Sequence, residues 1–407
     1  MRARLLMLCL FAILLTAIPL SAQDDSESPL LRLLSYVPDT PDYRSFVQYG
    51  DQAAWFESWG FEPFASLADF ERRGDEGDFT TTAWMFITAE QTLPPNALGL
   101  QYVLQDEMRP AFGFDIFNSD RYLQAGEPPE WITLVEGNFS ERQIGQALTA
   151  TGYAADELDD TTLYSINEDY EVTLTSDLPR VAQLGDLNRI VVGDDRLVIA
   201  KATPVIESAL DARSGETPSL ADDPAFSAAA AALEGEAVSD MGALVGAILM
   251  DGAQLMDPEF HFGPRLTPEM LEAFEESLAE LPALPPYDIA AFATYHQTGQ
   301  SWLVVALVHP EGTDAEAAAE ALQARFESYT SAVTNEPFME LLGDRGVELR
   351  SVRAVEASGR PVTLLVLEDP DPTLELDEDG RRDTYVFSWN RMVFARDLGF
   401  LAVVEED

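Results

Sequence analysis

The sequence predicts an α+β fold built from two related subdomains, each a mostly antiparallel sheet with helices packed on one face. Segments rich in β-branched and aromatic residues alternate with segments of helical periodicity, which favours a mixture of strands and helices. Hydrophobic residues make up 46% of the 407 residues, enough to bury a core. An order of strand, capped helix, strand and hairpin occurs twice. We therefore expect subdomains over residues 23–214 and 215–407, the second a distant repeat of the first.

The first half is expected to begin with a strand over residues 46–49 and a helix that Asp51 caps and Gly60 ends. A later helix starts after Ser140, which with Gln143 three residues on fits a capping box. The other expected elements are strands over 80–88, 131–135 and 161–166, a short helix over 119–124, and a hairpin of strands 189–192 and 196–200.

The second half is expected to follow a join rich in turn formers at residues 213–224, with a helix capped by Asp223. Thr267 caps another helix in the same way. The apolar run 241–250 is too short to cross a membrane and predicts a buried strand or helix. The other expected elements are a strand over 302–308, a helix over 313–329 capped by Thr313, strands over 347–352 and 361–367, a hairpin of 385–388 and 392–395, a closing strand over 401–404, and a turn over 295–299.

Residues 1–22 have the pattern of a secretory signal peptide. Two arginines precede an apolar run over residues 5–18, and Ala22 offers a small residue for cleavage. The alternative is an uncleaved membrane anchor, because the run is close to the length that spans a bilayer. We expect a bacterial protein that is secreted or held at the cell envelope. The single cysteine, Cys9, lies within the leader, so the mature chain has no disulfide and no thiolate ligand or nucleophile.

Acidic residues outnumber basic ones by 72 to 24, for a formal net charge of −48. Nucleic-acid binding is excluded as a main role, since phosphate recognition needs clustered Lys and Arg. The charge favours a soluble monomer, and it favours cationic partners such as an envelope component or a basic protein. The acid excess, with a single lysine, can reflect adaptation to a saline habitat or a GC-rich genome combined with a need for solubility, and the sequence leaves both origins open.

Consecutive segments of the first half share a pattern with a known group of proteins. A strand at 196–201 is followed by a helix at 203–211 that ends in Ala-Leu-Asp, and then by Ser-Leu-Ala-Asp-Asp-Pro-Ala-Phe at 219–226. Upstream, residues 131–153 join a strand to a helix and a Gly-Tyr pair. Over roughly residues 110–230 the chain resembles a widespread group of bacterial exported proteins and lipoproteins that carry a domain of unknown function. The resemblance implies export but brings no activity, cofactor or ligand, and the chain lacks the lipidation cysteine of the lipoprotein members.

One acidic segment is a weak candidate for calcium binding. Glu375, Asp377 and Asp379 precede Gly380 as carboxylates precede the turn glycine of an EF-hand loop, and Asp383 adds a fourth acid. The twelfth position of that loop holds a valine where a bidentate acid is needed. A solvated acidic loop between strands is therefore the favoured interpretation.

The sequence has no motif that identifies an enzyme. It contains no zinc-protease, nucleophile-elbow, Walker or dinucleotide-binding pattern, and its three histidines are not at ligand spacing. With so many acids, no catalytic pair can be selected, so catalytic residues are unassigned and no cofactor is expected. The leading hypothesis is a non-catalytic binding or scaffold module. The alternatives are a hydrolase that acts on an extracellular polymer through carboxylates in a cleft between the subdomains, and a carrier of apolar ligands.

Overall fold

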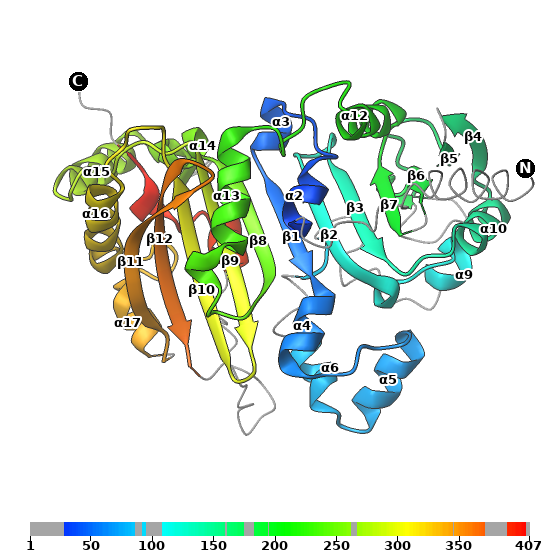
Figure 1. The fold of residues 1–407 in the computed structure, drawn as a ribbon, viewed down its shortest axis with the longest axis horizontal. Coiled ribbons are helices and arrows are strands. Elements are labelled where there is room, and N and C mark those ends of the chain that lie inside the picture. The colour runs from blue at the N-terminus through cyan, green and yellow to red at the C-terminus, as the bar shows by residue number, and fades with distance from the viewer. Residues whose placement is uncertain are drawn as a thin grey trace, which may run out of the picture.

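The structure is a computed structural model that describes residues 28–85, 92–94, 108–158, 161–174, 183–193, 195–261, 267–344, 346–370 and 389–403. Within these residues, one twelve-stranded sheet, antiparallel throughout, runs through the molecule (Figure 1). Its strands are β1 (Val47–Asp51), β2 (Ser119–Ala125), β3 (Ile132–Gly137), β4 (Ala154–Leu158), β5 (Thr161–Ser165), β6 (Arg189–Val192), β7 (Arg196–Ala200), β8 (Ala243–Asp251), β9 (Ile289–Gln297), β10 (Gln300–Val308), β11 (Glu348–Ala357) and β12 (Arg360–Asp369). They lie side by side in the order β11-β12-β10-β9-β8-β1-β2-β3-β7-β6-β5-β4, so β11 and β4 are the outer strands.

The sheet consists of two halves that repeat one strand order. β1, β2 and β3 pair in sequence, as β8, β9 and β10 do. Helix α10 (Glu141–Thr151) or α16 (Ala315–Ser328) follows, and the last strand of each half, β7 or β12, returns beside β3 or β10. Pairing of β1 with β8 joins the halves. The two halves thus share a topology, while the subdomain boundary after residue 214 stays a prediction.

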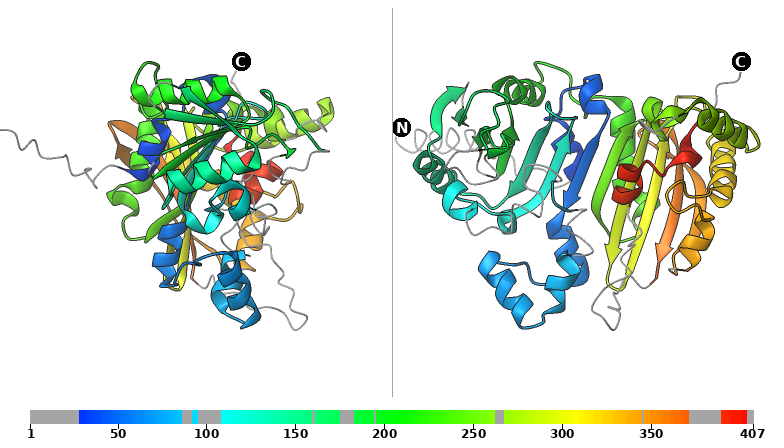
Figure 2. Two further views of the ribbon diagram at one scale, coloured as in Figure 1. Left: turned by 90° about the vertical axis from the view of Figure 1, so that its right-hand side faces the viewer. Right: turned by 180° about the vertical axis from the view of Figure 1, so that it is seen from behind.

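Helices lie on both faces of the sheet. The front face, turned to the viewer in Figure 1, carries α2, α12 and α13. Most of the other helices belong to the back (Figure 2, right). In the part of the chain that the structure describes, the helices and short 3-10 turns are α2 (Pro29–Leu34), α3 (Pro41–Arg44), α4 (Gln52–Trp59), α5 (Leu67–Asp75), α6 (Phe79–Ala83), α9 (Met108–Phe112), η2 (Ile116–Asn118), α12 (Thr203–Ser214), α13 (Pro224–Glu234), η3 (Glu236–Val238), α14 (Gly252–Met256), η4 (Pro258–His261), α15 (Pro268–Ala279), α17 (Phe338–Gly343), α18 (Trp389–Ala395) and η6 (Gly399–Leu401), besides α10 and α16.

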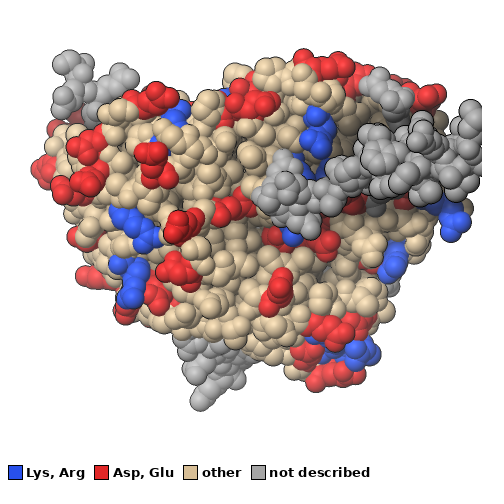
Figure 3. All heavy atoms as spheres, viewed as in Figure 1, with Lys and Arg blue, Asp and Glu red and all other residues tan. Residues whose placement is uncertain are grey.

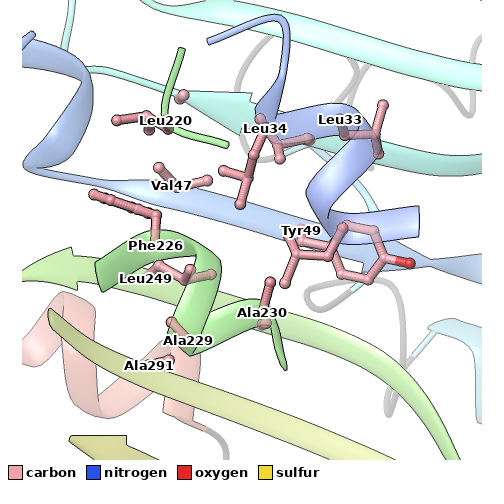
Figure 4. Packing of buried hydrophobic residues seen from close by; sticks show 14 of the residues in the cluster. Leu33, Leu34, Val47, Tyr49, Leu220, Phe226, Ala229, Ala230, Leu249 and Ala291 are labelled. Carbon is pink, nitrogen blue, oxygen red and sulfur yellow. The ribbon is translucent and has the colours of Figure 1, made fainter. Parts of the chain in front are cut away.

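The front core is continuous across both halves. Helices α2 and α13 meet above β1 and β8, where Leu34 and Phe226 pack on Val47 and Leu249 (Figure 4). The sheet-facing side of α13 is rich in buried alanine, which lets the helix lie close to the strands. Because this apolar cluster extends from β7 to β12, burial on the front face holds the two halves together.

The back face, in contrast, carries two separate apolar clusters. One lies under α4, α9 and α10 and includes Trp55 and Ile199; the other lies under α14, α16 and α18 and includes Phe292 and Leu365. The α+β class is confirmed. The expectation that helices cover only one face is wrong, because β7 and β9 are apolar on both sides and both sides must be shielded.

The predicted helix caps at Asp51 and Ser140 are confirmed. Asp51 accepts a hydrogen bond from the Ala54 amide to begin α4, and Gly60 ends it at a φ of 67°. Ser140 accepts from the Gln143 amide to begin α10. The first-half hairpin is β6–β7, and the apolar run 241–250 is the strand β8. The strands expected at 131–135, 161–166, 302–308, 347–352 and 361–367 are also present, as β3, β5, β10, β11 and β12.

Two predicted elements of the first half have the wrong type. The segment expected as a strand at 80–88 begins with helix α6, because Asp78 accepts from the Thr80 amide and caps a helix there. The segment expected as a helix at 119–124 is strand β2, with Tyr122 and Leu123 fully buried. The first error overlooked a local cap, whereas in the second the tertiary position of β2 outweighs local propensity.

The second half also differs from the prediction near its end. Residues 392–395, expected as a strand, belong to helix α18. Residue 401, where the closing strand was expected to begin, is the last residue of a 3-10 turn, and residues 402–403 are not in a strand. His296 lies in β9, so the predicted turn is confined to the two residues between β9 and β10. Asp314, not Thr313, caps α16. The leader at 1–22, the strand at 385–388 and the calcium candidates Glu375, Asp377, Asp379 and Asp383 lie outside the described residues.

Candidate functional site

A row of polar side chains lies where the two back clusters separate. Gln48 of β1 is the register partner of Gln124 of β2, which is the register partner of Thr133 of β3. Their strand neighbours belong to the front core, so the alternation of side chains turns all three toward the back. Each is only 1% exposed. Three adjacent strands therefore bury polar side chains next to one another, in a row across the back of the sheet.

The hydrogen bonding of this row is incomplete within the described part of the chain. Gln48 Nε2 donates to the hydroxyl of Tyr122 at 2.7 Å, and burial raises the pKa of Tyr122, which keeps that hydroxyl neutral. Gln124 Oε1 and Thr133 Oγ1 have no hydrogen-bond partner there. A buried polar atom without a partner costs about 1–3 kcal/mol, so its presence needs a reason.

A pocket of about 340 Å³ lies against Gln124 and is lined by both halves of the molecule. The first half contributes Phe46 and Trp131, and the second contributes Gln254 of α14 and Phe394 of α18. Small-molecule sites have volumes of roughly 300–1,000 Å³, with apolar walls and a few polar groups. The pocket at the seam, which we call the seam pocket, has both the size and this composition.

Two further polar atoms of the seam pocket have no hydrogen-bond partner among the described residues: Trp131 Nε1, a donor, and Gln254 Oε1, an acceptor. Lys201 Nζ lies over the Trp131 indole, 4.7 Å from the ring centroid. Lys201, the single lysine of the sequence, also pairs with Asp186 at 2.9 Å. Burial raises the pKa of Asp186, against the influence of Lys201. This arrangement fixes the orientation of the tryptophan.

The rim of the seam pocket is aromatic and carries one charge of each sign. Phe394 is 61% exposed, and its ring centroid lies 6.0 Å from that of Phe46 in the other half. The Arg396 guanidinium lies 4.8 Å from the ring centroid of Phe260 and donates to its carbonyl. Glu127 is exposed on the opposite side of the seam. Phe394 therefore presents an apolar face to solvent at the edge of the pocket.

A second group of ionisable residues lies on the front face and is structural. Asp51, Arg121, Glu136 and Arg196 are register partners on β1, β2, β3 and β7, and their charges alternate. Arg121 pairs with Asp51 at 2.5 Å, and Arg196 pairs with Glu136 at 2.6 Å. Arg32 of α2 completes this charge ladder at 2.7 Å from Glu136. The ladder ties four strands to the helix that covers them.

The two carboxylates of the ladder have opposite pKa shifts. Burial raises the pKa of Asp51 and outweighs the nearby Arg121. Burial also acts to raise the pKa of Glu136, but Arg32 and Arg196 outweigh it, and the net shift is downward. Glu136 is therefore the acid that the arginines hold in its charged form.

The described residues do not form a metal centre or bring together a catalytic pair of acids at the seam. No group of three or more potential ligands is found among them, and Glu127 is the one acid that lines the seam pocket. The histidines lie apart: His261 contacts the Leu255 carbonyl, His309 contacts Thr363, and His296 contacts Ser301. Burial lowers the pKa of His296 to about 3, so it is neutral at physiological pH.

The acidic surface is visible in Figure 3, where red side chains are spread over the front and blue ones are fewer. A larger depression of about 710 Å³ lies along the outer side of α10, next to Tyr164. It is open and lined mainly by one helix. Among the described residues, no helix has the length and apolar character that crossing a bilayer requires.

Sequence reasoning did not find the seam pocket. Its central residue, Gln124, falls in the segment expected to be a helix. The available signal was the glutamine inside the predicted strand 46–49, a polar residue flanked by apolar ones. The register that brings Gln48, Gln124 and Thr133 together is non-local, and sequence spacing does not supply it.

No protein-family model matches the sequence, and no curated protein matches it. Among solved structures, crystal form III of TP0453 aligns with 82% of this chain and 92% of its own, at 9% identity and a TM-score of 0.32. Crystal form I of TP0453 aligns with 83% of this chain and 91% of its own, at 10% identity and a TM-score of 0.32. A likeness this distant carries no information about function.

Proposed function

We propose that the protein is a non-catalytic binding protein that holds a small molecule in the seam pocket. The observation that carries the proposal is the set of buried polar atoms without a partner in the described chain, from Gln124, Trp131 and Gln254, in one aromatic-walled pocket. Buried polar groups are nearly always hydrogen-bonded, so such a cluster is best explained by a ligand that supplies the missing bonds.

Export is part of the proposal and rests on the sequence. The leader at residues 1–22 and the resemblance to exported bacterial proteins both favour a location at the envelope or outside the cell. The net charge of −48 favours a soluble monomer that meets cationic envelope components or basic proteins. Mass spectrometry of the exported protein should find a chain that begins after Ala22; an intact Met1 would contradict cleavage.

The binding proposal is tested with a defined metabolite library and native mass spectrometry. The wild-type protein should retain at least one compound, and Gln124→Leu should lose it, because leucine removes the carboxamide and keeps a similar volume. Gln146→Leu is the matched control, since Gln146 is an exposed glutamine on α10, beside the larger depression. Retention of no compound, or equal retention by wild type and Gln124→Leu, would overturn the proposal.

A further inference from the structure

Among the described residues, the buried polar groups that line the seam pocket are all uncharged. Gln124 and Trp131 are 1% and 7% exposed, and Gln254 is half-buried. The charged groups that line the pocket, Arg396 and Glu127, are both exposed. An ion placed against neutral buried groups would lose its hydration without an opposite charge to replace it. The part of a ligand that enters the pocket is therefore neutral.

The unpaired atoms set the hydrogen bonds that a ligand must make. Gln124 Oε1 and Gln254 Oε1 need donors, and Trp131 Nε1 needs an acceptor. A hydroxyl group offers one donor and two acceptor lone pairs, so a ring with several hydroxyls meets all three needs without a charge. An acyl chain meets none of them and would leave each atom buried and unpaired, which disfavours the carrier of apolar ligands.

The rest of the pocket wall is mainly apolar and includes aromatic rings. The rings of Phe46 and Phe394 meet at an interplanar angle of 42° across the seam, and Phe260 adds a third ring. Such faces match the C–H face of a sugar ring, whose hydroxyls point outward around its edge. Because Gln124 belongs to β2 and Gln254 to α14, one rigid ring that contacts both carboxamides would connect the two halves.

We infer that the ligand of the seam pocket is a neutral sugar unit, which packs on the aromatic rim and hydrogen-bonds to Gln124, Trp131 and Gln254. The inference rests on the proposed binding function and names its ligand class. It leaves open whether the sugar is free or is the end of a longer chain, because the pocket is open to solvent at the rim. Free sugars and short oligosaccharides are separate arms of the test.

The test is isothermal titration of the full mature chain with glucose, galactose, N-acetylglucosamine and their β-linked dimers. Glucuronate probes a charged sugar, dodecanoate an apolar chain, and indole-3-acetamide a flat amide. We expect at least one neutral sugar to bind saturably and to raise the melting temperature, and we expect glucuronate to bind at least tenfold more weakly. Tighter binding of the dimers than of the single sugars would identify a chain end as the natural ligand.

Variants locate the binding. Gln124→Leu and Gln254→Leu should each weaken the affinity for the sugar at least tenfold, while Gln146→Leu leaves it unchanged. Gln254→Leu guards against misfolding of the more buried variant, since Gln254 is half-buried on a short helix, and circular dichroism checks both. Binding of dodecanoate or indole-3-acetamide that depends on Gln124, with no sugar binding, would overturn the inference and leave the binding function standing. Sugar binding that neither variant weakens would also overturn it.

Discussion

The two halves of the sheet share a strand order but are stabilised differently. In the second half, the centre of β10 is apolar on both faces, and Val304 and Val305 are both fully buried on opposite sides. In the first half, the corresponding strand β3 carries buried Thr133 on one face and buried Glu136 on the other. One topology thus supports two kinds of third strand: β10, whose central residues are apolar on both faces, and β3, which buries polar side chains on both faces. In the first half, the front row is the charge ladder, and the back row consists of neutral side chains that can form hydrogen bonds.

Of the substitutions that distinguish the two halves, Glu136→Ala should have the largest effect on the free energy of unfolding. The Glu136 side chain is 7% exposed and faces Arg32 and Arg196, so Glu136→Ala leaves two poorly solvated guanidinium groups without a carboxylate. We expect a loss of about 3–5 kcal/mol in the free energy of unfolding, measured by urea denaturation. Glu368→Ala is the matched control in the second half: its partner Arg350 is 67% exposed, and the expected loss is about 0–1 kcal/mol. Equal losses would remove the distinction between the halves.

A cavity introduced by substitution in the second half tests whether the two halves unfold together. Leu365 of β12 is fully buried in the second-half back cluster, so Leu365→Ala should cost about 2–5 kcal/mol. Because the front core is continuous, we expect hydrogen exchange to accelerate to a similar extent in β1–β3 and in β9–β10. Faster exchange confined to the second half would show that the halves unfold separately.

The smallest expected effect is a dependence of stability on pH that arises from the charge ladder. The folded-state pKa of Glu136 lies below its usual value of 4.5, so its ionised form contributes stability that is fully present above that value. This contribution is lost as the pH falls through the lower, folded-state pKa. The stability difference between wild type and Glu136→Gln should therefore be constant from pH 7 to 5 and shrink below about pH 4.5, as measured by urea titration at each pH. A difference that grows on acidification would mean that the pKa is raised.

The sequence was sufficient for the fold class and for elements whose ends carry a local physical signal. The α+β class follows from alternating patterns, and α4 and α10 follow from the caps at Asp51 and Ser140. These signals involve residues within one turn of each other, so neighbouring sequence contains all of the information.

Features that depend on distant contacts could not be predicted. Strand β9 contains three alanines, which do not favour strands, yet it pairs between β8 and β10 and is almost wholly buried. The continuity of the sheet depends on the pairing of Val47 with Leu249, about two hundred residues apart. The seam pocket lies next to that pairing, so it was hidden for the same reason.

The open ends of the sheet have a consequence for how copies of the protein behave in solution. An outer strand can act as a template on which another chain adds a strand, which leads to polymers. On β4 this risk is reduced by exposed Asp156 and Glu157, since two such edges would repel each other on approach. The outer strand β11 carries Glu348 and Arg350 in exposed positions. A long sheet can thus stay dispersed at high concentration because its borders are charged.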